Sequence, residues 1–243
     1  ALVADDVPGD KVLAPESVIP FRIERAEALD RFKGWLKRKW LAPSDLKRKA
    51  QADLLKGVYV PFWTYDAHAD SEWTAMSGTY YYTTQTYRDA QGRTQTRQVR
   101  HVRWWPSAGT HAAFYDDVPV CASKGLDPGL LSKIEPFDMK ALTLYDARIL
   151  AGWQAEACAL PLREGWKQAA KRVRDSEYSE CDRRVPGDTH MSLEVRTSLS
   201  EMKFKQALLP VWIAAYRYGK KTHRFLVNGQ TGELHGTSPV SPW

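Results

Sequence analysis

The chain of 243 residues has only three cysteines, and none lies close to another in the sequence. Cys121, Cys158 and Cys181 form no Cys-x-x-Cys pair, which excludes a zinc ribbon within these residues. An odd and scattered set also gives no disulfide framework. Reduced thiols are typical of the cytosol, so we expect a cytoplasmic protein.

Long hydrophobic runs are also missing. No apolar stretch approaches the ~18 to 20 residues of a membrane-spanning helix, and the N-terminus lacks the apolar core of a signal peptide. The sequence begins at Ala1 rather than Met, which is what a fragment or a processed product would show. Segments missing from such a fragment are where a membrane anchor or further metal sites would lie.

The motifs of common nucleotide-binding and hydrolytic enzymes are absent. The chain has no Gly-x-x-x-x-Gly-Lys-Ser/Thr or Gly-x-Gly-x-x-Gly loop to hold phosphates, and no Gly-x-Ser-x-Gly turn. These absences predict a protein that does not hydrolyse ATP. We expect a non-enzyme that has no cofactor in this chain, and the sequence identifies no small-molecule substrate.

One group of residues has the chemistry of a metal site. His68, Asp70 and Glu72 alternate along a predicted strand and therefore project from one face. Neighbours on one face of a strand lie roughly 6 to 7 Å apart, so these side chains diverge unless the strand bends. They are a weak candidate for a metal-dependent hydrolase, and the alternative is a polar, exposed strand.

The charge balance is basic. Lysine and arginine number 35 against 29 acidic residues, a formal net charge of +6. This balance suits an anionic partner, such as a nucleic acid or an acidic membrane surface. It is also common among proteins that bind neither.

Two stretches, one in each half of the chain, share an apolar pattern that contains proline and tryptophan. Residues 56–66 read Lys-Gly-Val-Tyr-Val-Pro-Phe-Trp-Thr-Tyr-Asp, and residues 206–216 read Gln-Ala-Leu-Leu-Pro-Val-Trp-Ile-Ala-Ala-Tyr. The first is apolar on both faces, which predicts a buried central strand. Residues 206–216 repeat this pattern, which predicts a second core strand and two related halves that pack together.

The order of patterns predicts an α+β fold of antiparallel sheets with two helical pairs. Residues 1–16 form a linker or arm, 17–133 the first half and 134–243 the second, within one compact unit. Helices are predicted at 24–40, 44–55, 127–134, 145–159 and 162–184. Strands are predicted at 17–23, 56–66, 78–88, 94–105, 112–118, 189–198, 203–217, 223–228 and 233–236, with turns at 89–93, 106–109 and 228–232.

Two surfaces are candidates for binding. The first helical pair is strongly basic, and Lys37, Arg38, Lys47 and Arg48 would face a phosphate-bearing partner or simply water. The second surface combines tyrosines on one strand with arginines on its partner, which can stack bases or contact a protein. The same residues also make ordinary cross-strand pairs. Its candidate residues are Tyr80, Tyr82, Arg97, Arg100 and Arg103.

Five motifs together resemble a bacterial protein family. They are Ser17-Val-Ile-Pro-Phe-Arg-Ile, Gly57-Val-Tyr-Val-Pro-Phe-Trp-Thr-Tyr-Asp, Ile134-Glu-Pro-Phe-Asp, Leu208-Leu-Pro-Val-Trp-Ile-Ala-Ala-Tyr and Val227-Asn-Gly-Gln-Thr-Gly-Glu. The family is that of transcription factor IIB-type zinc-ribbon-containing proteins, often labelled primosomal protein N-prime (replication factor Y) or superfamily II helicase-like. The resemblance implies zinc ribbons before this region and a membrane segment after it, both outside this chain.

The resemblance implies a non-catalytic module on the cytoplasmic side of a membrane. Our first hypothesis is an interaction or scaffold domain that binds a protein or an anionic membrane through the basic helices and the hairpin. The alternatives are a nucleic-acid-binding accessory protein of replication or repair, without helicase motor motifs, and the metal-dependent hydrolase.

Overall fold

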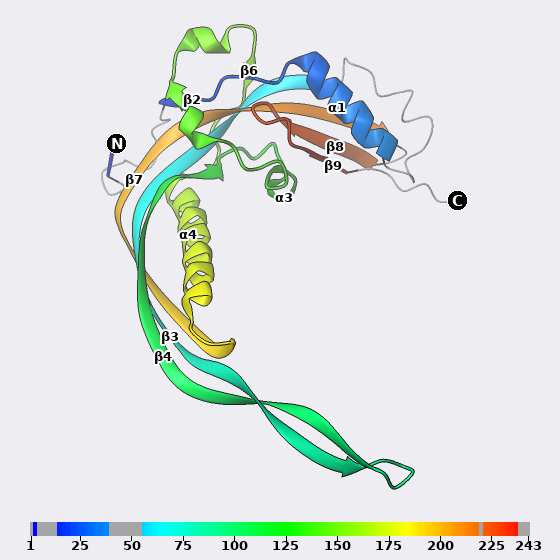
Figure 1. Cartoon of the computed structure of the whole chain (residues 1–243). Coiled ribbons are helices and arrows are strands. Elements are labelled where there is room, and N and C mark those ends of the chain that lie inside the picture. The colour runs from blue at the N-terminus through cyan, green and yellow to red at the C-terminus, as the bar shows by residue number, and fades with distance from the viewer. Residues whose placement is uncertain (1, 4–13, 39–54, 219–220, 238–243) are drawn as a thin grey trace. The chain divides into compact units, whose positions relative to one another are not determined.

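The computed structural model describes residues 2–3, 14–38, 55–218 and 221–237. Within them the chain forms one sheet with few helices (Figure 1). The strands are β1 (Leu2–Val3), β2 (Ser17–Val18), β3 (Leu55–Arg88), β4 (Thr94–Cys121), β5 (Thr143–Leu144), β6 (Gln154–Ala155), β7 (Thr189–Tyr218), β8 (Lys221–Asn228) and β9 (Leu234–Gly236). The helices are α1 (Arg25–Arg38), α3 (Pro128–Leu131) and α4 (Leu162–Arg184), with 3-10 turns η2 (Met139–Ala141) and η3 (Ala147–Leu150).

The sheet is built around three long strands. Its order is β4-β3-β7-β2-β5, and in addition β6 pairs with β3, β1 and β8 pair with β7, and β9 pairs with β8. Trp63 packs on Phe204, and further along β3 Ser71 contacts Thr197. Residue numbers rise in β3 as they fall in β7, so these two strands are antiparallel, as the α+β prediction requires.

The chain divides into two compact units, and each is assembled from separate stretches of sequence. Unit 1 contains Ala1–Tyr65, Asp117–Ala169 and Lys203–Trp243, and unit 2 contains Asp66–Asp116 and Ala170–Met202. Most of the first proline-containing stretch and all of its repeat at 206–216 lie in unit 1. Two related halves, with one copy in each, are therefore not confirmed.

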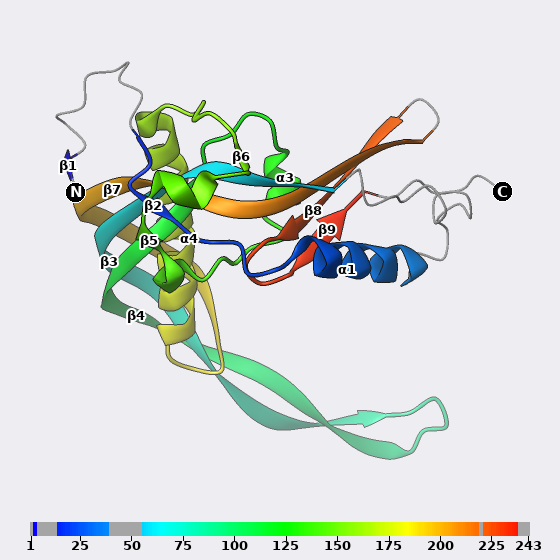
Figure 2. The same ribbon diagram turned by 90° about the horizontal axis from the view of Figure 1, so that it is seen from above.

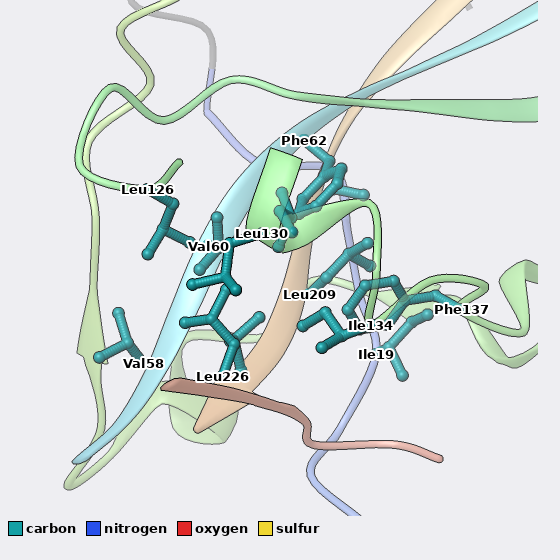
Figure 3. Packing of buried hydrophobic residues seen from close by; sticks show 13 residues of the cluster. Ile19, Val58, Val60, Phe62, Leu126, Leu130, Ile134, Phe137, Leu209 and Leu226 are labelled. Atoms are coloured by element: carbon teal, nitrogen blue, oxygen red, sulfur yellow. The ribbon is translucent and has the colours of Figure 1, made fainter. Parts of the chain in front are cut away.

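The predicted central strand is confirmed in unit 1. Val58, Val60 and Phe62 point from β3 to the side where Leu130 of α3 and Ile134, which follows α3, lie (Figure 3). On its other face, Tyr59 packs with Val18 of β2 and Leu208 of β7. Both faces of β3 are thus buried, as its continuous apolar pattern indicates.

The first helix of the chain covers another part of unit 1. Figure 2 shows α1 alongside β8 and β9. Phe32 of α1 packs on Phe225 of β8 with ring centroids 4.1 Å apart, and Trp35 lies beside the same ring. The predicted helix over 24–40 is therefore confirmed as Arg25–Arg38. Its predicted partner at 44–55 falls outside the described residues up to Leu55, where β3 begins.

Several predicted boundaries were wrong. Residues 145–159 form η3 and β6 instead of a helix, because Asp146 caps a single turn and Gly152 adopts a positive φ of 83°. β4 continues through the predicted turn at 106–109. Pro106 is tolerated there because β4 lies at one end of the strand order, where a missing N–H need cost no ladder bond.

The C-terminal strands follow the prediction more closely. The two strands expected at 189–198 and 203–217 are one strand, β7, in which Glu201 has a positive φ of 52°. The turn at 228–232 is confirmed, and the side-chain oxygen of Asn228 accepts from the N–H groups of Gln230 and Thr231. The strand expected over 17–23 is limited to Ser17–Val18.

Two helical glycines provide a matched test of this packing. A Cβ added to Gly165 of α4 would lie 2.3 Å from the hydroxyl oxygen of Tyr65, which is itself held by a 2.7 Å hydrogen bond to the Leu162 carbonyl. Gly34 of α1 has no atom within 4 Å of such a Cβ. Alanine normally stabilises a helix by about 1 kcal/mol relative to glycine.

We expect Gly165→Ala to lower the free energy of unfolding by about 1 to 3 kcal/mol through overpacking. Gly34→Ala should raise it by roughly 0.5 to 1 kcal/mol. Urea denaturation followed by tryptophan fluorescence measures both. Equal effects of the same sign would show that α4 does not approach β3 this closely.

Candidate functional site

The predicted tyrosine and arginine surface is an exposed hairpin in unit 2. We define the Tyr/Arg hairpin as residues 78–105, which comprise the end of β3, the connecting turn and the start of β4. The rings of Tyr81, Tyr82 and Tyr87 are 43%, 62% and 47% exposed. The segment holds five arginines, at 88, 93, 97, 100 and 103, against a single acid, Asp89. It therefore presents a concentrated positive charge together with aromatic surface.

The tip of the hairpin is closed by one carboxylate. Asp89 accepts hydrogen bonds from the N–H groups of Gln91 and Arg93, and from the Arg93 side chain at 2.9 Å. The bond from the Arg93 backbone contributes most to a pKa of Asp89 below its ordinary value. Gly92 supplies the positive φ of 77°. The predicted turn at 89–93 is thus confirmed. The negative charge of Asp89 is paired within the turn itself.

The base of the hairpin is fixed by the turn before β7. The carboxylate of Asp188 accepts from the N–H of Tyr80 at 2.7 Å, and the N–H of Asp188 donates to the Gly78 carbonyl at 2.8 Å. Gly187 has a φ of 105°, and an added Cβ would lie 2.7 Å from the same carbonyl. Because β7 begins only at Thr189, β3 and β4 are the only described strands that continue beyond this point (Figure 1).

The candidate side chains are divided between the two faces of the hairpin. The Arg100 guanidinium lies 4.4 Å from the Tyr80 ring centroid, on the face that Tyr82 shares by alternation. On the opposite face Arg97 lies 5.6 Å from the Tyr87 ring, and Arg103 lies 5.6 Å from the Tyr81 ring. Both faces therefore carry cation–π pairs.

Three arginines of the hairpin, Arg97, Arg100 and Arg103, have no ion pair with an acid among the described residues, whereas Arg93 is paired with Asp89 at the tip. Arg97 donates to the side-chain oxygen of Gln85 at 3.0 Å, a neutral acceptor. On α4 the arrangement is different, because Lys171 pairs with Asp175 at 2.6 Å and Arg184 pairs with Glu180 at 2.5 Å. These two basic residues of α4 are thus compensated by acids, while the three arginines that stack on tyrosine rings in the hairpin are left available.

The candidate side chains of the predicted basic helical pair cannot be placed from the described residues. Lys37 and Arg38 belong to the last turn of α1, but their side chains lie outside the description. Lys47 and Arg48 fall outside the described residues altogether. The basic helical pair therefore remains a prediction.

The predicted metal candidates lie on one exposed face of β3. His68 Nδ1 is 3.1 Å from a carboxylate oxygen of Asp70, so these two are neighbours as the alternation indicates. The ligand atoms of His68, Asp70 and Glu72 do not all come within 4.8 Å of one another. The strand does not bend enough to make them converge, so this geometry does not favour the metal-dependent hydrolase.

A buried carboxylate in unit 2 was missed by the sequence analysis. Glu177 of α4 has no solvent exposure. One oxygen accepts from Tyr115 at 2.8 Å, and the other accepts from Ser71 at 2.6 Å and His111 at 2.9 Å. A signal for it exists: Val173, Glu177 and Cys181 follow each other at four-residue steps on the buried face of α4.

The electrostatics of this network favour a structural role. Burial raises the pKa of Glu177, but the hydrogen bonds from Ser71, His111 and Tyr115 outweigh it, so the pKa lies below its ordinary value. Burial, followed by the hydrogen bond to Glu177, raises the pKa of Tyr115. The carboxylate is charged and fully hydrogen-bonded, and it ties α4 to β3 and β4. We therefore assign Glu177 to stability rather than to catalysis.

Comparisons with known proteins give one informative likeness. The chain is similar to the uncharacterized protein YdjG of Bacillus subtilis (strain 168), with 28% identity over 244 residues that cover 99% of this chain and 68% of that protein. No family model matches the chain, and no solved structure matches it. Among the described helices, none is both long enough and apolar enough to cross a membrane.

The buried carboxylate predicts a specific acid sensitivity. Because the pKa of Glu177 is lowered in the folded chain, its contribution to stability is complete above its ordinary value of 4.5 and is lost as the pH falls through the folded value. We expect Glu177→Gln to lower the free energy of unfolding at pH 7 by about 2 to 3 kcal/mol, since an amide cannot accept from three donors.

The difference between this variant and the wild type should shrink in acid. Urea denaturation from pH 7 down to pH 3 measures it. Glu72→Gln, on the exposed face of β3, is the control and should leave stability unchanged. A loss at Glu177 that stays constant with pH would contradict the assignment of a charged carboxylate.

Proposed function

We propose that this chain is a non-catalytic interaction domain that uses the Tyr/Arg hairpin to bind an acidic partner protein. The observation that carries the proposal is the pairing of exposed arginines with tyrosine rings, without neutralising acids among the described residues. Arg100 over Tyr80, at 4.4 Å, is the tightest of these pairs. Stacking holds each guanidinium in place while its N–H groups remain available to carboxylates.

The division of the pairs between two faces favours a partner with a groove. A flat membrane surface would contact Arg100 or Arg97 and Arg103, but not both faces at once. A protein that encloses a two-stranded ribbon can contact both. Tyrosine and arginine are also enriched at the centres of protein interfaces, where they contribute most of the binding energy.

Single-stranded nucleic acid is the second candidate. Tyr82 is 62% exposed and lies on the face that carries Arg100, so its ring is accessible to a base. Base stacking on an aromatic ring contributes about 1 to 3 kcal/mol and needs no sequence preference. This candidate fits the same charge but depends more strongly on Tyr82 than the acidic-protein proposal does.

Charge reversal of the hairpin tests the proposal. The triple variant Arg97→Glu, Arg100→Glu and Arg103→Glu should bind a labelled Asp/Glu-rich peptide at least about tenfold more weakly, because each surface charge contributes roughly 0.5 to 1 kcal/mol. Fluorescence anisotropy across a salt series measures the affinity. The matched control reverses Arg163, Arg174 and Arg196, which are exposed outside the hairpin, and should keep the wild-type affinity.

Two further probes separate the alternatives. Binding to a single-stranded oligonucleotide that is tighter than peptide binding, and is lost in Tyr82→Ala, would favour the nucleic-acid candidate. Preferential binding to vesicles that contain phosphatidylserine would favour a membrane surface. Equal peptide affinity in the two triple variants would overturn the role of the hairpin.

A further inference from the structure

A pocket of about 670 Å³ opens in unit 1 and shares no residue with the Tyr/Arg hairpin. It lies where the segment before α1, the start of β3 and the residues around β6 meet. Its volume falls within the range of roughly 300 to 1,000 Å³ that is typical of small-molecule sites. The pocket is therefore large enough for a ligand of two or three fused rings.

Aromatic rings form the apolar wall of the pocket. Trp153 stacks on Phe21 with ring centroids 4.1 Å apart and planes 9° apart. Trp212 meets both rings edge-on, at 5.0 Å from Phe21 and 5.6 Å from Trp153. Its indole N–H donates to the Ile23 carbonyl at 2.9 Å, which fixes its orientation. The wall is thus held in place before any ligand arrives.

A glycine in β3 makes this arrangement possible. A Cβ added to Gly57 would lie 2.3 Å from Cζ3 of Trp153 and 3.1 Å from Cζ3 of Trp212. Any other residue would push the Trp153 ring away from the strand. The packing of the aromatic wall therefore depends on glycine at this position.

Cations predominate at the rim. Arg22, Arg25 and Lys56 line the pocket with exposed side chains, and Glu24 is the acid among the residues that line it. The 14-residue helix α1 begins at Arg25, so the positive end of its dipole lies at the same rim. Charge and dipole both favour an anion there.

We propose that this pocket binds a small planar molecule that carries a carboxylate or a phosphate group. The ring system packs against the aromatic wall of Trp153, Phe21 and Trp212, and the anionic group contacts Arg22 and Lys56 at the rim. Ligand binding in this pocket is separate from the proposed function of the Tyr/Arg hairpin, because the two sites share no residue.

Three probes of the same ring size test the proposal on the full chain: naphthoate, naphthyl phosphate and the neutral naphthamide. Isothermal titration calorimetry gives their affinities. We expect the anions to bind more tightly than the amide, and the comparison of the two anions shows which acid group the rim prefers. Amide binding as tight as anion binding would overturn the role of the rim.

Variants then locate the site. Arg22→Gln with Lys56→Gln should weaken the preferred anion roughly tenfold and leave the amide unchanged. Lys124→Gln with Lys133→Gln, exposed elsewhere in unit 1, is the matched control. Trp153→Leu should weaken all three probes. Circular dichroism checks folding, and the rim variants keep the test valid if Trp153→Leu unfolds.

Two results would overturn the proposal: no binding of either anion, or unchanged anion affinity in the rim variant. The triple hairpin variant of Arg97, Arg100 and Arg103 should bind naphthoate as the wild type does. Failure of the hairpin proposal and failure of the pocket proposal are therefore distinguishable.

Discussion

The burial pattern along β3 is the constraint on which the rest of the structure depends. Residues 58–65 are buried on both faces. Residues 66–75 alternate between buried positions on one face and partly buried or exposed positions on the other, and residues 79–88 are largely exposed. A strand needs cover on each apolar face, so the first part lies inside unit 1 and the second is covered on one face by α4. The third part has too little apolar surface to require cover, and it forms the hairpin.

Much of this pattern could be predicted from the sequence. The continuous apolar run around Phe62 predicts a core strand, and the Asp89–Arg93 turn follows from its glycine and aspartate. The predicted helix from Leu162 to about Arg184 is confirmed as α4, because Pro161 precedes it and Pro186 follows. The fold class also follows, but the two-unit division does not. Each unit is assembled from distant stretches, and local periodicity carries no information about which stretches meet.

The misses have physical causes that one sequence does not reveal. Pro106 and Gly109 have the composition of a turn, but Gly109 provides the space in which the Trp73 ring lies, 2.6 Å from a hypothetical Cβ. Glu177 looks like one more charge on a polar helix, and only the meeting of β3, β4 and α4 brings Ser71, His111 and Tyr115 to it. The pocket of unit 1 likewise depends on Trp153 and Trp212, which are far apart in the sequence.

Glu177 and the hairpin arginines carry their charges in opposite environments, one buried and the other exposed to water. A buried carboxylate is stable only when its hydrogen bonds outweigh the cost of desolvation, and Glu177 meets this condition with three donors. The hairpin arginines remain in water, where their charge costs little, and tyrosine rings restrict their motion. A guanidinium that is already ordered loses less entropy on binding than a free one. The same stacking that makes an ordinary cross-strand pair therefore also prepares the hairpin for an anionic partner.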